Sequence, residues 1–245
     1  MNIDIESLER ATVDAVAPQH VDTLPGWLLP MDRGTVGRAF SAVPLTHVPA
    51  DASVVAVIEA RYQAQGLPTV FRLADLPAFA GLQASLQAAG YRRHKPTLVQ
   101  TGRAYALRSL SMLQPADVQD HAGEGWPRLF TSDGFDAADG LGRVQALSRA
   151  AGSAYASVTM GGRVVAAGVA AFSHGWCSIH GVRTEQAHRG QGLAGRVLAA
   201  LAQAALDQGQ ERVFLQVEEG NSAAISLYRK AGFETAWRYE YWRRD

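Results

Sequence analysis

The chain has 245 residues, 47% of them hydrophobic, and 23 basic side chains balance 23 acidic ones, so we expect a globular protein that binds no nucleic acid. The lone cysteine, Cys177, excludes an internal disulfide framework and a cysteine-built metal site. No apolar run approaches the roughly 20 residues that cross a bilayer, and residues 1–6 lack a signal-peptide pattern, so the sequence predicts a cytoplasmic protein without a membrane partner.

The first part of the chain has a pattern that returns later. The apolar run 54–58, a glycine at 66 and a strand start at 70 have counterparts 143 residues further on (54 to 197, 66 to 209, 70 to 213). After a gap of one residue, the Ala-Gly-aromatic corner at 89–91 matches the corner at 231–233. Both parts have the sequence pattern of a helix, a strand, a second helix, a glycine-aromatic corner and a strand, in that order. This repeat indicates a duplicated domain. We therefore predict domains over 1–105 and 121–245, joined by a crossover over 106–120.

The second part has readable elements. Strands are predicted over 155–160, 164–172 and 176–184, the first two joined by a Gly-Gly turn. A helix over 192–208 has its apolar residues on one side and stops at Gly209. Further strands are expected over 212–217 and 235–242. The fold class is α/β of the α+β kind: a mostly antiparallel sheet, mixed at its end, with helices packed on it.

A glycine-rich run, Arg-Gly-Gln-Gly-Leu-Ala-Gly at 189–195, connects the strand that ends at Thr184 to the long helix. A strand that turns sharply into a helix leaves convergent N–H groups unpaired, and the helix dipole adds positive potential there. Gly190 and Gly192 allow the turn and the close approach of a pyrophosphate, and Arg189 adds a positive charge. The run therefore predicts a phosphate-binding cradle.

The first domain lacks this cradle. The positions 143 residues before Arg189, Gly192 and Ala194 hold Thr46, Pro49 and Asp51. Proline lacks an N–H donor and aspartate repels phosphate, so we expect a degenerate copy that supports the fold or shapes the acceptor site.

A second motif follows the cradle, from Asn221 to Phe233. The order Arg-x-x-Gly-x-Ala and then Asn-x-x-Ala-x-x-Leu-Tyr-x-x-x-Gly-Phe resembles the GNAT superfamily of acetyl-CoA-dependent N-acetyltransferases. The resemblance is strong over 154–242 and weak before it. It implies a tandem-GNAT architecture of two GNAT-like domains, of which the second is active. It also implies that 126–149 supplies two acceptor-side helices, where Asp136 and Asp139 either attract an amine or are solvated charges.

The resemblance implies site residues as well. Acetyl-CoA is the implied co-substrate, and Tyr228 would give a proton to the leaving thiolate, since a phenol with a pKa of about 10 is protonated at neutral pH. The backbones of Val182 and Thr184 would pair with the pantetheine arm, and Asn221 would bind the pantetheine or the adjacent backbone. The implied cofactor-binding residues are Val182, Thr184, Arg189, Gly190, Gln191, Gly192, Leu193, Ala194, Gly195 and Asn221. The ordinary alternatives are a helix cap for Asn221 and a core position for Tyr228.

The motifs do not specify a general base. Glu218 is the first candidate, because its strand should open toward the acceptor at that point. Glu219, His180 and Glu240 are alternatives, as is a chain of water molecules to bulk solvent. The competing interpretation is a solvated charge for the loop glutamates and a hydrogen-bonded core residue for His180.

Together these features predict direct transfer of acetyl from acetyl-CoA to a primary amine of a small molecule or peptide, without a covalent enzyme intermediate. Alternatives are a non-catalytic acetyl-CoA or CoA sensor module and an acyltransferase with a longer acyl donor. A nucleotide-phosphate binder is disfavoured, because no Lys-Ser/Thr pair follows the glycines. Cys177 has no base paired with it and is expected in the core. The acceptor and the oligomeric state stay open.

Overall fold

The computed structural model describes residues 3–244. The helices are α1 (Ile5–Val16), α2 (Val54–Ala64), α3 (Ala80–Ala88), α4 (Ala104–Arg108), α5 (Trp126–Phe130), α6 (Ala137–Leu147), α7 (Leu193–Asp207) and α8 (Ser222–Lys230), with the 3-10 turns η1 (Gly37–Ala39), η2 (Pro77–Phe79) and η3 (Gln186–His188). The strands are β1 (His20–Leu24), β2 (Trp27–Met31), β3 (Val43–Pro44), β4 (Phe71–Ala74), β5 (Arg92–Arg103), β6 (Asp117–Gln119), β7 (Ala154–Met160), β8 (Arg163–Ser173), β9 (Trp176–Thr184), β10 (Arg212–Glu218) and β11 (Glu234–Arg243). The elements predicted after residue 150 are confirmed, with bounds that differ by at most one residue.

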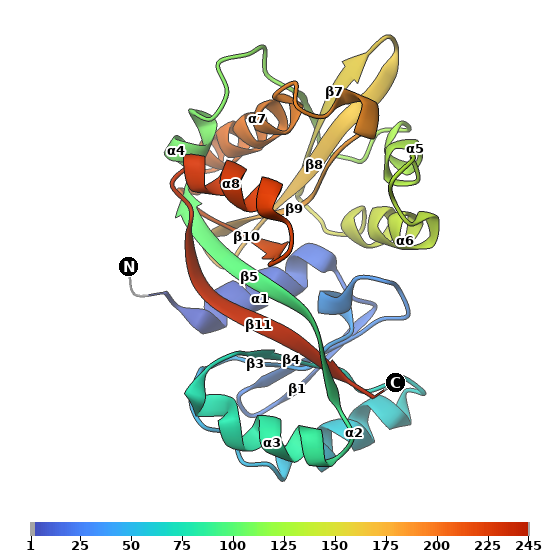
Figure 1. Ribbon diagram of the computed structural model, residues 1–245, viewed down its shortest axis with the longest axis vertical. Coiled ribbons are helices and arrows are strands. Elements are labelled where there is room, and N and C mark those ends of the chain that lie inside the picture. The colour runs from blue at the N-terminus through green and yellow to red at the C-terminus, as the bar shows by residue number, and fades with distance from the viewer. Residues whose placement is uncertain (1–2, 245) are drawn as a thin grey trace.

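One large sheet organises the molecule (Figure 1). Its strand order is β4-β11-β5-β10-β9-β8-β7-β6, and a small separate sheet holds β1, β2 and β3. Neighbouring strands of the large sheet are antiparallel except β9 and β10, which are parallel. The predicted mixed, mostly antiparallel sheet with packed helices is therefore confirmed.

Strands from both parts of the chain alternate in this sheet. β5 lies between β10 and β11, and β11 lies between β5 and β4. The sequence repeat matches β4 with β10 and β5 with β11. If the members of each pair are exchanged, the order β4-β11-β5-β10 becomes the same order read from its other end. The domain boundaries at 105 and 120 stay a prediction, because strands from both parts of the chain belong to one sheet. The expected crossover contains the end of α4 and the edge strand β6.

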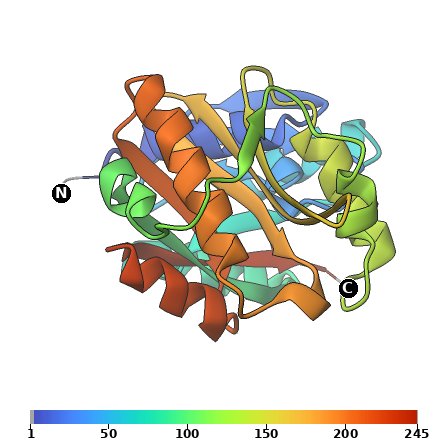
Figure 2. The ribbon, with the colours of Figure 1, turned by 90° about the horizontal axis from the view of Figure 1, so that it is seen from above.

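Helix α7 is held close against the sheet by its apolar stripe. Leu193, Val197 and Leu201 are almost fully buried, and the helix contacts β7, β8 and β9. In Figure 2, α7 (orange) crosses in front of the strands. A Cβ at Gly168 in β8 would lie 2.8 Å from Val197 Cγ1, so glycine is needed there for the helix to approach. Gly209 (φ +71°) follows α7 as the left-handed residue that the sequence predicted.

Two apolar cores lie on opposite faces of the sheet. The first joins α7 to β7–β10 and includes Tyr228 and Phe233. The second joins α1, α2 and α3 to β4, β5 and β11, and takes in Trp176 and Phe214 from β9 and β10. Helix α1 covers β8 and β9 on this second face. Within residues 3–244, no helix combines the length and apolar character that crossing a membrane requires.

His47 is half-buried and packs against the second core, with its ring centroid 4.9 Å from that of Trp237 and 5.9 Å from that of Phe79. Burial, and secondarily the charge of Arg72, lowers the His47 pKa from 6.5 to about 4. Between these values the unfolded chain binds a proton that the folded chain does not, so stability should fall as the pH drops from 6.5 toward 4. In urea unfolding, His47→Phe should flatten the pH dependence of the midpoint. Parallel curves for the wild type and the variant would contradict this assignment.

Candidate active site

The two parallel strands at the centre of the sheet separate from each other. β9 and β10 pair over three positions, which end at Ile179 opposite Leu215. The register of β9 against β8 also shifts between Ala167 and Val169, so β9 carries a bulge next to this gap. Gly181 occupies the bulge with φ +58°, and a Cβ there would lie 2.6 Å from Leu147 Cδ1. The bulge therefore requires glycine, and it leaves the last residues of β9 unpaired with β10.

A cavity of about 1350 Å³ opens where the strands diverge. Side chains alternate along β9, so Ile179 faces the α7 core while Ser178 and His180 face the α1 side. The cavity lining includes Tyr228 from the α7 side and Arg38 from the α1 side. Because typical small-molecule sites have volumes of about 300–1000 Å³, this cavity has room for a cofactor and an acceptor together. The cavity is therefore lined from both faces of the sheet.

The predicted cradle has the expected backbone. Gly190 (φ +77°) and Gly192 (φ +75°) are both left-handed, and α7 begins after Gly192 without a side-chain cap. A Cβ on Gly190 would meet nothing within 4 Å, so this face of the turn is open. Nine of the ten predicted cofactor-binding residues line the cavity, and Gln191 does not. Uncapped N–H groups at this helix start are suited to bind an anion.

Arg189 turns toward the end of β9. Its Nε donates a hydrogen bond to the Thr184 carbonyl oxygen (3.3 Å), and its guanidinium lies 5.6 Å from the ring centroid of Phe135. The positive charge is thus held beside the cradle.

Tyr228 and Asn221 both come from the α8 segment. Within residues 3–244 the Tyr228 hydroxyl has no hydrogen-bond partner, although the ring is packed near Phe233 and is 8% exposed. Burial raises the Tyr228 pKa to about 12, so the phenol is protonated at neutral pH. Asn221 caps α8, its Oδ1 accepting a hydrogen bond from the Ala224 N–H (3.2 Å), which confirms the capping role. Among residues 3–244 its side-chain amide nitrogen has no hydrogen-bond partner, and Asn221 lines the cavity.

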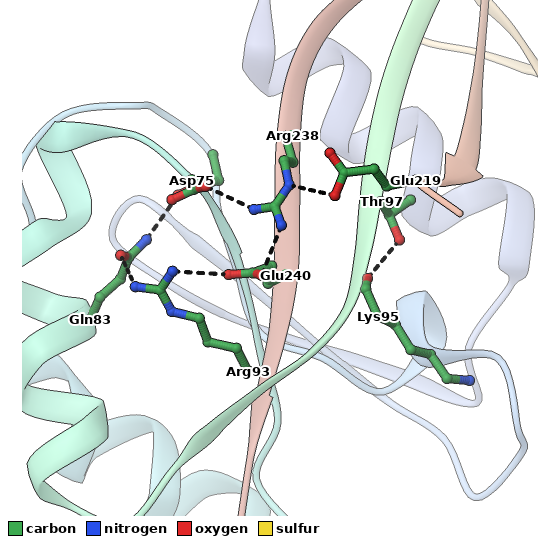
Figure 3. A network of polar contacts seen from close by, with 9 residues as sticks. Asp75, Gln83, Arg93, Lys95, Thr97, Glu219, Arg238 and Glu240 are labelled. Carbon is green, nitrogen blue, oxygen red and sulfur yellow. Dashed lines mark hydrogen bonds and ion pairs between the residues drawn. The ribbon is translucent and has the colours of Figure 1, made fainter. Parts of the chain in front are cut away.

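The structure separates the glutamate candidates for the general base. Glu218 is exposed and lines the cavity at the end of β10. Glu219 and Glu240 are outside the lining, and both accept hydrogen bonds from Arg238, at 3.2 and 3.0 Å (Figure 3). These two carboxylates are neutralised by an arginine, which leaves Glu218 as the glutamate that faces the cavity.

His180 is buried and both its ring nitrogens are engaged. Nδ1 lies 3.4 Å from Arg38 Nη2, and Nε2 contacts the Ser178 hydroxyl. A guanidinium can only donate, so Nδ1 accepts and Nε2 carries the proton. Burial, and then the charge of Arg38, holds the His180 pKa well below 6.5. The interpretation as a hydrogen-bonded core histidine therefore fits better than the general base.

The acidic pair near α6 is also engaged. Asp136 caps the helix, its Oδ1 accepting from the Asp139 N–H (2.7 Å). Asp139 pairs with Arg143 at 2.6 Å and with Arg183 at 3.3 Å. Helices α5 and α6 are present where acceptor-side helices were expected, but neither Asp136 nor Asp139 lines the cavity. Cys177 is fully buried, as expected for a core residue.

The comparisons with known proteins agree with this geometry. The family model described as "Probable histone acetyltransferase Rv0428c C-terminal" matches residues 3–242. The chain belongs to this family of GNAT acetyltransferases. It is 24% identical to YobR of Bacillus subtilis, an uncharacterized N-acetyltransferase, over 243 residues, which are 97% of this chain and 98% of that protein.

Solved structures show the same fold. A GCN5-related N-acetyltransferase from Kribbella flavida superimposes with a TM-score of 0.73 at 17% identity, over 100% of this chain and 96% of that one. A tandem GNAT protein from the clavulanic acid biosynthesis pathway gives a TM-score of 0.61 at 13% identity, over 98% of this chain and 95% of that one. The overall architecture of this acetyltransferase is therefore that of GNAT proteins of similar length.

The cavity of this acetyltransferase also contains residues that the motifs did not indicate. Arg38 comes from η1, and Lys95 and Tyr241 come from β5 and β11. Lys95 is a non-glycine residue with φ +50°, next to a register shift in the pairing of β5 with β11. Strained backbone of this kind is often found at functional sites, but the strain does not show in the sequence.

Proposed function

We propose that this acetyltransferase moves acetyl from acetyl-CoA to a primary amine by direct attack. The observation that carries the proposal is the divergence of β9 and β10 beside the glycine cradle, with the Tyr228 hydroxyl in the same cavity. The cradle and Arg189 would bind the pyrophosphate. Free N–H groups of β9 in the gap would polarise the acetyl carbonyl, which then requires no special side chain.

The residues would then divide the proton transfers between them. The amine nitrogen bonds to the acetyl carbon and the carbon–sulfur bond breaks, so one proton must leave the nitrogen and one must reach the sulfur. Glu218, or water beside it, would take the first proton. Tyr228 would give the second and recover it from solvent. The cytoplasmic location and a small-molecule or peptide acceptor, without nucleic acid or membrane, belong to the same proposal.

Cofactor binding can be tested with two matched glycines at opposite ends of the α7 region. Gly190 (φ +77°) and Gly209 (φ +71°) are both left-handed and both open to solvent. Gly190→Asp should weaken acetyl-CoA binding by roughly tenfold or more, because its carboxylate would face the phosphates. Gly209→Asp should lose a similar amount of thermal stability but bind acetyl-CoA normally. Isothermal titration calorimetry measures the acetyl-CoA affinity of the two variants. Equal affinities in the two variants would remove the cradle from the cofactor site.

Catalysis is tested separately by acetyl-CoA-dependent thiol release with a panel of amines, amino acids and peptides. Amine-dependent release supports the transferase. Tight binding of acetyl-CoA without thiol release for any amine would favour the sensor module. Thiol release from longer acyl-CoA donors alone would favour an acyltransferase that uses a longer acyl group.

A further inference from the structure

Arg38 presents a positive charge to the cavity without a carboxylate partner. Its Nη1 donates to Gln216 Oε1 (3.3 Å) and its Nη2 to His180 Nδ1 (3.4 Å), and both acceptors are neutral. The Nε atom is buried without a hydrogen-bond partner. Within residues 3–244 no acid forms an ion pair with Arg38. Burial raises the pKa of Glu9 against the opposing charges of Arg72 and Arg38, and Glu9 is itself paired with Arg72 at 2.6 Å.

The partners of Arg38 are fixed in turn. Gln216 Nε2 donates to Thr12 Oγ1 (3.0 Å), and Gln216 Oε1 also accepts from the Tyr239 hydroxyl (2.9 Å). His180 is held by Ser178. The guanidinium is therefore held in one place before any ligand arrives. Such a group suits a carboxylate, which a guanidinium binds through two parallel hydrogen bonds.

The position of Arg38 indicates which ligand it serves. His180 immediately precedes Gly181, where β9 leaves β10, so Arg38 lies beside the gap that would hold the acetyl group. It lies on the α1 side of the sheet, whereas Tyr228 packs in the core on the α7 side. The cradle is likewise at the start of α7. The anion that Arg38 faces is therefore in the acceptor half of the cavity, apart from the pyrophosphate site.

The rest of the lining carries charge of the same sign. Of the described residues that line the cavity, Glu218 is the one carboxylate. Lys95 lines it without an ion-pair partner in residues 3–244, and its ammonium points away from the acids around Arg238 (Figure 3). Arg143 and Arg183 share the single carboxylate of Asp139. A lysine-rich peptide would meet repulsion here, and an anionic acceptor would be attracted.

We propose that the acceptor is a small amine that also carries a carboxylate, such as an amino acid. Its carboxylate binds Arg38, and its amine then lies at the gap between β9 and β10. This inference rests on the proposed function and narrows its acceptor class. Arg38 acts as a specificity residue that touches the acceptor, not as an acid or base.

The test compares amino acids with their amides as acceptors in thiol release. The wild type should prefer the acid by roughly 10- to 100-fold in kcat/KM, the usual effect of a hydrogen-bonded charge pair. An amide loses its ammonium proton more readily than the acid does, so ease of deprotonation would give the opposite preference. Arg38→Gln should bring the acid-to-amide ratio close to one, and Arg38→Lys should restore part of it. Arg33→Gln, in the exposed start of the same loop and outside the lining, should keep the wild-type ratio.

A second readout is independent of turnover. In the presence of CoA, the wild type should bind an N-acetyl amino acid more tightly than the N-acetyl amide, and Arg38→Gln should lose this difference while it still binds acetyl-CoA. If no amine is acetylated, the proposed function fails, and product binding still tests the anion site. Equal use of acid and amide, preference for a lysine-rich peptide, or no binding of the N-acetyl acid would each overturn the proposal.

Discussion

Replacing Tyr228 with phenylalanine should lower kcat for acetyl transfer by roughly 10²- to 10⁴-fold, the usual contribution of a positioned acid, while acetyl-CoA binding changes little. Tyr228 lines the cavity and its hydroxyl has no hydrogen-bond partner in residues 3–244, so removal of the hydroxyl leaves no partner unsatisfied. With its pKa raised to about 12, the phenol keeps its proton across the accessible pH range. A loss of rate at alkaline pH below that value should therefore come from another group.

The matched control is Tyr155→Phe. Tyr155 is also buried, but its hydroxyl donates to the Leu147 carbonyl oxygen (2.7 Å) away from the cavity. This variant should lose some stability and keep kcat. If Tyr228→Phe also keeps the wild-type kcat, the thiolate takes its proton from solvent and Tyr228 is only a core residue.

Breaking the Glu9–Arg72 pair should have the largest effect on stability. Arg72 Nη2 lies 2.6 Å from Glu9 Oε2, and the two side chains are 1% and 3% exposed. Removing one partner leaves an uncompensated buried charge, so Arg72→Met and Glu9→Leu should each lower the free energy of unfolding by about 3–5 kcal/mol. The pair joins α1 to β4, and the charge of Arg38 acts on Glu9, so activity should fall as well.

The double variant Glu9→Leu/Arg72→Met provides the check. With both charges gone, the double variant should lose less free energy of unfolding, measured with urea, than either single variant. If the double variant instead loses as much free energy of unfolding as the two single variants together, packing outweighs the ion pair. The stacking of Arg72 on Tyr239 at 5.2 Å is one such packing contact.

The elements after residue 150 were predictable because local signals define them. The stripe of Leu193, Val197 and Leu201 and the stop at Gly209 specify α7 without knowledge of any other element. The left-handed glycine turn at 190–192 was predictable for the same reason, because its glycines and the helix start lie within one short run.

Strand order and the acceptor side were not predictable, because they depend on distant parts of the chain. Nothing in the pattern of β5 indicates that its neighbours are β10 and β11. Arg38 lies 142 residues from His180 and 178 from Gln216, on a short turn without periodicity. The pairing of Glu219 with Arg238 was not predictable for the same reason, because the two residues are 19 apart in the chain and meet only in the folded sheet.

The interleaving of β4, β11, β5 and β10 makes the part of the chain without a cradle indispensable. A polypeptide restricted to 121–245 would have β10 and β11 with no β5 to separate them, and exposed strand edges of that kind recruit other chains. During synthesis, the ribosome makes β4 and β5 before β10 and β11, and the later strands then add to an edge that already exists. If the two parts arose by duplication, selection could remove the phosphate site from the first copy, but it could not delete the copy without losing the enzyme.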